Sequence, residues 1–137
     1  MSKRIESNKT AINCLPEKVY NFLGNFDNFG SLLPDQVSEW QSTGDSCSFE
    51  VKGLPKIGLR HVDKTPFVKI SMKSEGKLPF TFSFDTHIEA VSPQQCLVHL
   101  VIESDMNPFI AVMAEKPLQN FVDVLLVKLK DQMEGSA

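Results

Sequence analysis

The sequence predicts an α+β domain in the order strand, two helices, six strands and a long C-terminal helix. Between residues 36 and 106, apolar and polar residues alternate at a period of two, and short turn sequences separate the runs: TGDS, GLPK, DKTP, SEGKLP and SPQQ. On both sides of this region the apolar residues recur at helical spacing. Alternation is typical of strands, and short loops join successive strands antiparallel. We therefore expect one curved antiparallel sheet of seven strands.

The segment before the alternating region predicts the first strand and the first two helices. Residues 3–13 are polar and β-capable, and Pro16 with Glu17 marks the start of a helix. We expect a helix of about three turns, then a shorter one near residues 27–33 that ends before Pro34. The core-facing stripe is formed by Val19, Phe22, Leu23 and Phe26.

The last helix is expected to begin at Asn107 and Pro108, a side-chain cap followed by a proline in the first helical position. It runs to about Met133, with a break or kink at Lys116 and Pro117 because proline removes a helical hydrogen bond. Its buried stripe is expected to contain Leu118, Phe121, Val122, Leu125 and Leu129.

Length and charge exclude several classes of protein. The 137 residues are enough for one domain, spanning 1–137, and a net charge of -3 argues against binding to nucleic acid through a basic surface. The first residues carry positive charge but no apolar segment, so we expect no secretory signal and a cytoplasmic location. No apolar run is long enough for a transmembrane segment.

The three cysteines, Cys14, Cys47 and Cys96, are odd in number, widely spaced and without a CxxC pattern. That pattern argues against a disulfide framework and against a zinc knuckle. We expect all three to be small buried hydrophobic residues, with a reactive thiol at any one of them as the alternative.

The order of elements, together with the segment AINCLPEKVYNFLGNFDNFGSLLPDQV and the helix that follows the last long hairpin, resembles the START-like (SRPBCC) superfamily. The resemblance covers nearly the whole chain. It implies the helix-grip fold, in which a seven-stranded antiparallel sheet wraps around a long C-terminal helix. Relatives include polyketide cyclases or dehydratases and coenzyme Q-binding-like proteins, and they commonly enclose an apolar cavity between sheet and helix.

Alternation predicts which residues face that helix. Phe80, Phe82 and Phe84 share one face with Thr86, whereas His87 falls on the other face. The same count turns inward Cys47, Phe49 and Val51, then Ile57 and Leu59, then Val68, Ile70 and Met72, then Cys96, Val98, Leu100 and Ile102, and it puts Ala90 and Met106 on the inner side.

The resemblance implies an apolar ligand site lined by residues of these inner faces. The alternative is that the same side chains fill a core without any cavity. The expected lining consists of Phe49, Ile57, Leu59, His61, Ile70, Met72, Phe82, Phe84, Leu100, Ile102, Phe121 and Leu125.

His61 is the polar member of this set. Its parity with Ile57 and Leu59 turns it inward, where an imidazole could orient a ligand or exchange a proton near neutral pH. The alternative is a histidine near a strand end that bonds to backbone or solvent. A register slip of one residue would put Arg60 in its place.

His87 and His99 can face each other across the last hairpin if paired residue numbers sum to 186. Both belong to the outer face, and no third ligand is expected beside them. Zinc sites need at least three protein ligands, so we predict no metal and an exposed histidine pair.

Recognisable catalytic and cofactor motifs are absent from the sequence, which predicts no cofactor and favours a non-catalytic role. The first hypothesis is binding of a hydrophobic small molecule, such as a lipid, a polyketide or an isoprenoid-like compound. The alternatives are a polyketide cyclase or dehydratase using His61, and a protein-interaction adaptor with a closed core. For the adaptor or a homodimer, exposure of Val124 or Val127 on the C-terminal helix would indicate the contact surface.

Overall fold

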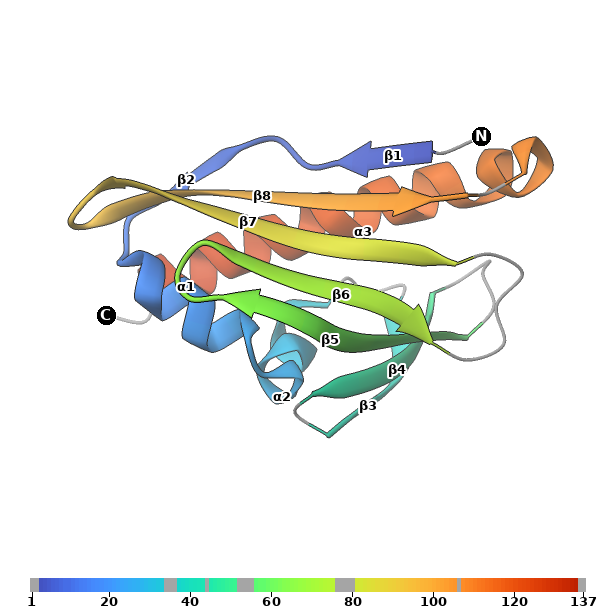
Figure 1. Cartoon of the computed structure of the whole chain (residues 1–137), viewed down its shortest axis with the longest axis horizontal. Helices are drawn as coiled ribbons and strands as arrows, with labels where there is room; N and C mark the ends of the chain where they lie inside the picture. The colour runs from blue at the N-terminus through green and yellow to red at the C-terminus, as the bar shows by residue number, and fades with distance from the viewer. Residues whose placement is uncertain are drawn as a thin grey trace.

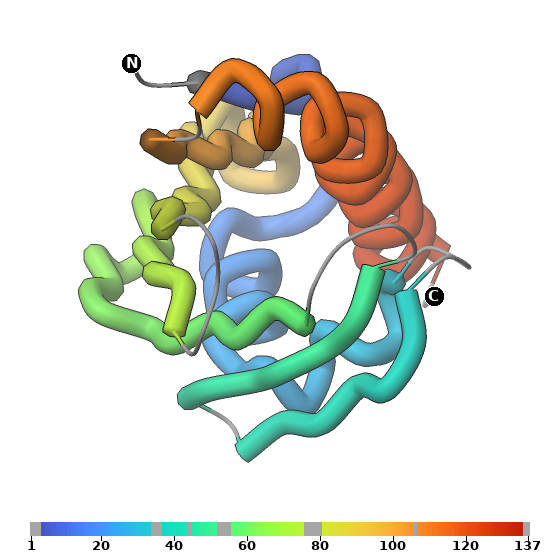
Figure 2. Tube along the Cα trace, turned by 90° about the vertical axis from the view of Figure 1, so that its right-hand side faces the viewer, coloured from blue at the N-terminus to red at the C-terminus, as the bar shows by residue number. Residues whose placement is uncertain are grey.

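The computed structural model describes residues 3–33, 37–43, 45–51, 56–75, 81–105 and 107–135. The described strands form one antiparallel sheet that curls around the C-terminal helix α3 (Figure 1). Seen along the helix, the sheet bends so that α3 lies along its open side (Figure 2). In chain order the elements are β1 (Lys3–Glu6), β2 (Thr10–Ile12), α1 (Pro16–Leu23), α2 (Phe26–Phe29), the 3-10 turn η1 (Gly30–Leu32), β3 (Val37–Ser42), β4 (Ser46–Val51), β5 (Ile57–Thr65), β6 (Lys69–Glu75), β7 (Phe82–Ser92), β8 (Gln95–Ser104) and α3 (Pro108–Gly135).

The strand order is β1-β8-β7-β6-β5-β4-β3, with β2 also paired to β8. This confirms the predicted helix-grip architecture, except that the first strand is broken in two. The break is at Ser7, whose backbone N–H donates to the carbonyl of Leu100 and whose hydroxyl accepts the N–H of Leu100, both at 2.9 Å. The Ser7 hydroxyl thus takes the place of a backbone carbonyl as acceptor for the Leu100 N–H, so β1 ends while this buried amide remains hydrogen-bonded.

Asparagine side chains cap the starts of α2 and α3, as was predicted for α3 at Asn107. The Asn25 carboxamide oxygen accepts the N–H of Asp27 at the start of α2, and the Asn107 carboxamide oxygen accepts the N–H of Ile110 at the start of α3, both at 2.9 Å. The helix α1 is two turns long rather than three.

Of the break or kink predicted in the last helix, the break is absent, because α3 continues through Pro117. Ala114 and Leu118, on either side of that proline, are both buried against the core and hold the two halves in one helix. The predicted buried stripe of α3 is confirmed at all five positions.

Two predicted inward positions are wrong. Val68 is 54% exposed, because β5 continues to Thr65 and the turn falls at residues 66–68 instead of within DKTP. Ala90 is exposed, near the end of β7. Phe80 and Met106, also predicted on the inner faces, lie outside the described residues.

Gly58 is a position where the fold requires a small residue. It lies opposite Glu75 in the sheet, and a Cβ atom there would lie 2.7 Å from the Glu75 carbonyl oxygen. We expect Gly58→Ala to lower the free energy of unfolding by about 1–2 kcal/mol, because overpacking forces the backbone to shift. Gly135→Ala is the matched control, since its added methyl has no neighbour within 4 Å. Urea unfolding of both variants measures the difference, and equal stabilities would contradict the expectation.

Candidate functional site

The interior between the sheet and α3 contains a continuous series of aromatic rings. Phe84 of β7 contacts Phe121 of α3 edge to face at 6.1 Å between ring centroids, and Phe121 stacks on Phe49 of β4 at 5.5 Å. The series continues through Trp40 and Phe29, then reaches Phe26 and His61. We call these rings the aromatic series: Phe84, Phe121, Phe49, Trp40, Phe29, Phe26 and His61.

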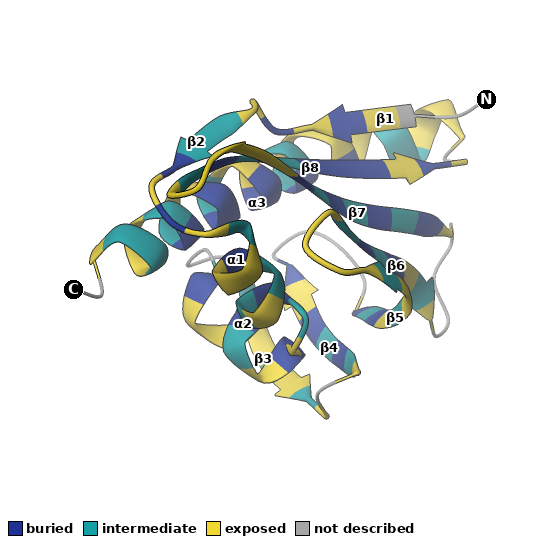
Figure 3. Cartoon of the chain, turned by 60° about the vertical axis from the view of Figure 1, so that its left-hand side comes forward, coloured by how far each residue is buried: buried dark blue, intermediate teal, exposed yellow. Residues whose placement is uncertain are grey.

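All the apolar residues predicted to line the site are buried, and they come from β4, β5, β6, β7, β8 and α3. Figure 3 shows buried residues along β7, β8 and the middle of α3. Phe49 and Phe84 meet Phe121 between them, so the sheet and the helix are in ring contact there. The sequence did not indicate that Trp40, Phe26 and Phe29 would extend this series from β3 and α2.

His61 points inward, as its parity predicted, and lies flat on the ring of Phe26 with centroids 4.2 Å apart. Arg60 points outward, where it forms an ion pair with Glu75 at 3.2 Å. Neither imidazole nitrogen of His61 has a close, well-aligned hydrogen bond within the described part of the chain, and both nitrogens are buried. The Leu23 carbonyl nevertheless acts on the ring as a backbone hydrogen-bond acceptor that raises its pKa, so the alternative of a histidine bonded to backbone is not contradicted.

Burial, together with the smaller effect of the Lys64 ammonium, lowers the pKa of His61 to about 4. Asp45 and the backbone carbonyl of Leu23 act in the opposite direction but are weaker. At neutral pH the ring is therefore uncharged, with one nitrogen that can donate a hydrogen bond and one that can accept.

Thr86 supplies a second buried polar group. It lies on the inner face of β7, opposite Ile70 of β6, and its hydroxyl has no hydrogen-bond partner among the described residues. In the sheet, His61 is opposite Met72, so Ile70 and Met72 of β6 separate the two groups. Sequence reasoning placed Thr86 on this face but gave it no role.

No protein-family model matches the chain, and no curated protein is significantly similar to it in sequence. Solved structures do match it over nearly all its length. Norcoclaurine synthase from Thalictrum flavum, in complex with dopamine and hydroxybenzaldehyde, superposes with a TM-score of 0.76 at 9% identity, covering 100% of this chain and 89% of that one. A START superfamily protein from Mycobacterium smegmatis gives 0.67 at 12% identity, covering 100% and 98%. A protein from Deinococcus radiodurans also gives 0.67 at 12% identity, covering 97% and 99%.

The chain has a START-like helix-grip fold. At these identities the likeness is one of fold, and it agrees with the resemblance carried by the N-terminal segment and the last helix.

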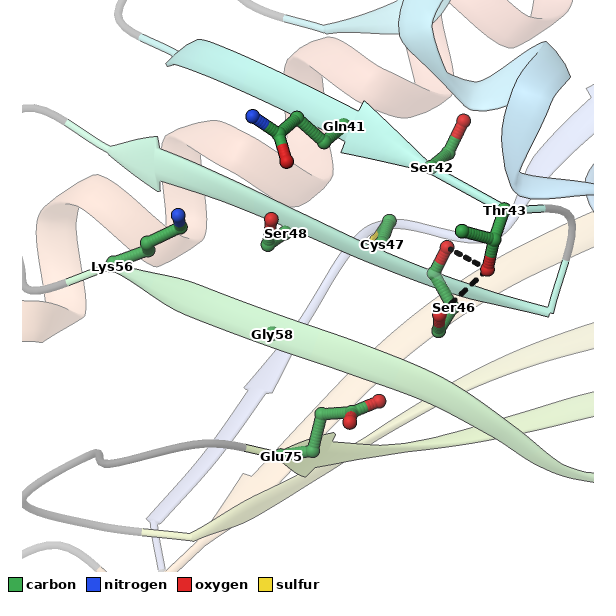
Figure 4. Close-up of a pocket in the computed structure, with 9 residues that line it drawn as sticks. All are labelled: Gln41, Ser42, Thr43, Ser46, Cys47, Ser48, Lys56, Gly58 and Glu75. Carbon is green, nitrogen blue, oxygen red and sulfur yellow. Dashed lines mark hydrogen bonds between the residues drawn. The ribbon is translucent and has the colours of Figure 1, made fainter.

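The outer surface of this START-like fold also carries grooves. A groove of about 470 Å³ runs over the outer side of β3 to β6, where Gly58 leaves space between Ser48 and Glu75 (Figure 4). Thr43 and Ser46 join by a hydrogen bond at one end of it, and Lys56 lies at the other. None of the predicted ligand-site residues lines this groove.

His87 and His99 are paired across the β7–β8 hairpin, which corresponds to a sum of 186, one of the two sums, 186 and 188, that the SPQQ turn allowed, and their ring centroids lie 6.1 Å apart. The pair is half-buried rather than exposed, because Glu6 of the neighbouring strand β1 covers His99, with its carboxylate 3.2 Å from Nε2. No cluster of three or more metal-ligating residues occurs among the described residues.

Exposed apolar residues follow the outer side of α3 in the START-like fold. Phe109 and Val112 are 77% and 79% exposed, and Met113 and Val127 are also exposed. Val124, the other position considered from the sequence, is partly buried. None of the described helices combines the length and apolar character needed to cross a membrane.

Proposed function

We propose that this protein binds one hydrophobic small molecule between the sheet and α3, that α3 or a neighbouring loop moves to admit it beside the ring contacts of Phe121, and that binding involves no catalysis. The START-like fold and the apolar inner faces support this proposal. The binding part of the proposal is also supported by the structure of norcoclaurine synthase, an enzyme of similar fold that holds dopamine and hydroxybenzaldehyde.

The observation that carries the proposal is a pair of buried polar side chains in a largely apolar interior: within the described part of the chain, the Thr86 hydroxyl has no hydrogen bond, and His61 keeps at least one ring nitrogen without one. Leaving a buried polar group without a hydrogen bond costs about 1–3 kcal/mol, so native proteins rarely keep one without a use. A ligand with an apolar body and one hydroxyl or carbonyl group would offset that cost. We place its polar group near Ile70 and Met72, between His61 and Thr86.

The low pKa of His61 favours binding over the cyclase or dehydratase alternative. A general acid or base works best when its pKa lies near the working pH. With a pKa of about 4, His61 is a weak base at neutral pH, yet it remains a good hydrogen-bond partner.

The test compares two probes of nearly the same shape, 2-naphthol and naphthalene, by equilibrium dialysis. We expect 2-naphthol to bind saturably, one per chain, and about fivefold more tightly than naphthalene, the ratio that a hydrogen bond of about 1 kcal/mol produces. His61→Phe, which keeps the stacking on Phe26, is expected to abolish this difference.

Two controls locate the binding. His87→Phe alters the outer face, and Val112→Glu removes an exposed apolar contact on α3, so neither is expected to change the ratio between the probes. Absence of saturable binding of either probe, together with native mass spectra that show no co-purifying small molecule, would overturn the proposal.

A further inference from the structure

Two of the three cysteines meet where β2 leaves the sheet. Ile12 of β2 pairs with Cys96 of β8, and Cys14 follows two residues later in a tight turn, with its N–H donating to the Ile12 carbonyl at 2.9 Å. Both cysteines are buried on the side of the core. Strands that are distant in the sequence thus bring two thiols together.

The two thiols are in direct contact. The thiol of Cys96 forms a hydrogen bond with the sulfur of Cys14, whose own thiol donates to the Leu15 carbonyl at 3.6 Å. Sulfur atoms within hydrogen-bonding reach can meet by side-chain rotation, which a disulfide between them requires. Cys47, in contrast, lies on β4 without another cysteine opposite it in the described sheet.

The two members of the pair differ in access. Cys14 borders a surface groove of about 530 Å³, together with Asn13, Lys18 and Met133, whereas Cys96 is fully buried behind it. Burial raises the pKa of both thiols, to about 11 for Cys96, while the hydrogen bond from Cys96 and the charge of Lys18 act to lower the pKa of Cys14. Cys14 is therefore the attacking thiol and Cys96 the resolving thiol.

We propose that Cys14 and Cys96 are a modification site that forms a reversible intramolecular disulfide, with a small-molecule disulfide as the oxidant. The Cys14 thiolate attacks one sulfur of oxidised glutathione, which forms a mixed disulfide and releases one glutathione thiolate. The Cys96 sulfur then attacks the Cys14 sulfur while its proton passes to the departing glutathione sulfur, which leaves as the second glutathione thiol. The protein dithiol gives up two electrons, and one glutathione disulfide becomes two thiols.

The bond would join the start of α1 to β8, close to the last turn of α3. There the Asn13 N–H donates to the Glu134 carboxylate at 2.8 Å, and Lys130 donates to the Ala11 carbonyl at 2.7 Å. Oxidation thus adds a covalent link where polar contacts already hold the N-terminal segment against α3.

The test incubates the whole chain with oxidised glutathione, alkylates the remaining thiols after denaturation and maps the peptides by mass spectrometry. We expect a Cys14–Cys96 linked peptide, a mass lower by about 2 Da before alkylation, and alkylation of Cys47 alone. The matched control Cys47→Ser is expected to form the same link.

Single variants separate the two roles. Cys96→Ser is expected to retain a stable glutathione adduct on Cys14, because no resolving thiol is left, whereas Cys14→Ser is expected to remain unmodified at Cys96. The peptide map of the unaltered chain tests the proposal even if the variants do not fold. An unmodified Cys14 in that map, a link that includes Cys47, or links only between two copies would each overturn the proposal.

Discussion

Replacing Phe121 with alanine is expected to lower the free energy of unfolding by about 3–5 kcal/mol, the usual cost of removing a buried phenylalanine. Phe121 is 2% exposed and contacts rings on both sides, stacked on Phe49 and edge to face with Phe84. Its removal takes away both contacts and leaves a cavity at the place where sheet and α3 touch. Guanidinium chloride unfolding, followed by circular dichroism, measures the loss.

Val127→Ala is the control for this prediction, because Val127 belongs to the same helix but is 60% exposed. We expect it to change the unfolding free energy by less than about 0.5 kcal/mol. A loss of less than about 1 kcal/mol for Phe121→Ala would show that the rings do not pack as described.

Acid is expected to destabilise the fold through His61. The pKa is about 4 in the folded protein and 6.5 for an ordinary histidine, so the unfolded chain binds the proton more tightly. The contribution of His61 to the free energy of unfolding is therefore fully present above about pH 6.5 and is lost as the pH falls toward 4. The loss is about 3 kcal/mol, because each unit of pKa difference corresponds to about 1.36 kcal/mol. Urea unfolding at intervals between pH 7 and pH 4 measures this slope.

His61→Phe isolates this contribution, since phenylalanine keeps the ring on Phe26 and cannot be protonated. The variant is expected to lose most of the decline between pH 6.5 and 4. Burial also lowers the pKa of His87, which acts in the same direction, so His87→Phe measures that smaller part. Parallel pH curves for the original chain and His61→Phe would contradict the prediction.

Much of the fold could be predicted from local sequence, because alternation and helical spacing record which side of each element is buried. The inward direction of His61 and Phe84 followed from parity alone, and the length of one turn limited the β7–β8 register to two choices, one of which pairs His87 with His99. The face of a strand and the register of a hairpin are both set by residues close together in the sequence.

The predictions failed where distant parts of the chain decide the outcome. Val68 lies in a turn because β5 stays paired with β6 up to Thr65. Its position two residues before Ile70 therefore does not predict that its side chain is buried. The contacts of Trp40 and Phe26 with the predicted lining, and of Cys14 with Cys96, depend on the packing of α2 and on the register of β2 against β8. No local pattern encodes either arrangement.

One extra residue in β5 links the sheet to the first helix. The register shifts between His61 and Asp63, so Val62 is the extra residue, and His61 and Lys64 both fall on the inner side although three positions separate them. Lys64 can then donate to the Gly24 carbonyl at 2.9 Å, which places a positive charge at the C-terminal end of α1, where the helix dipole favours it. If Val62 were instead paired regularly, opposite Ser71, Lys64 would fall on the outer side, so the helix would lose its cation while His61 kept its place.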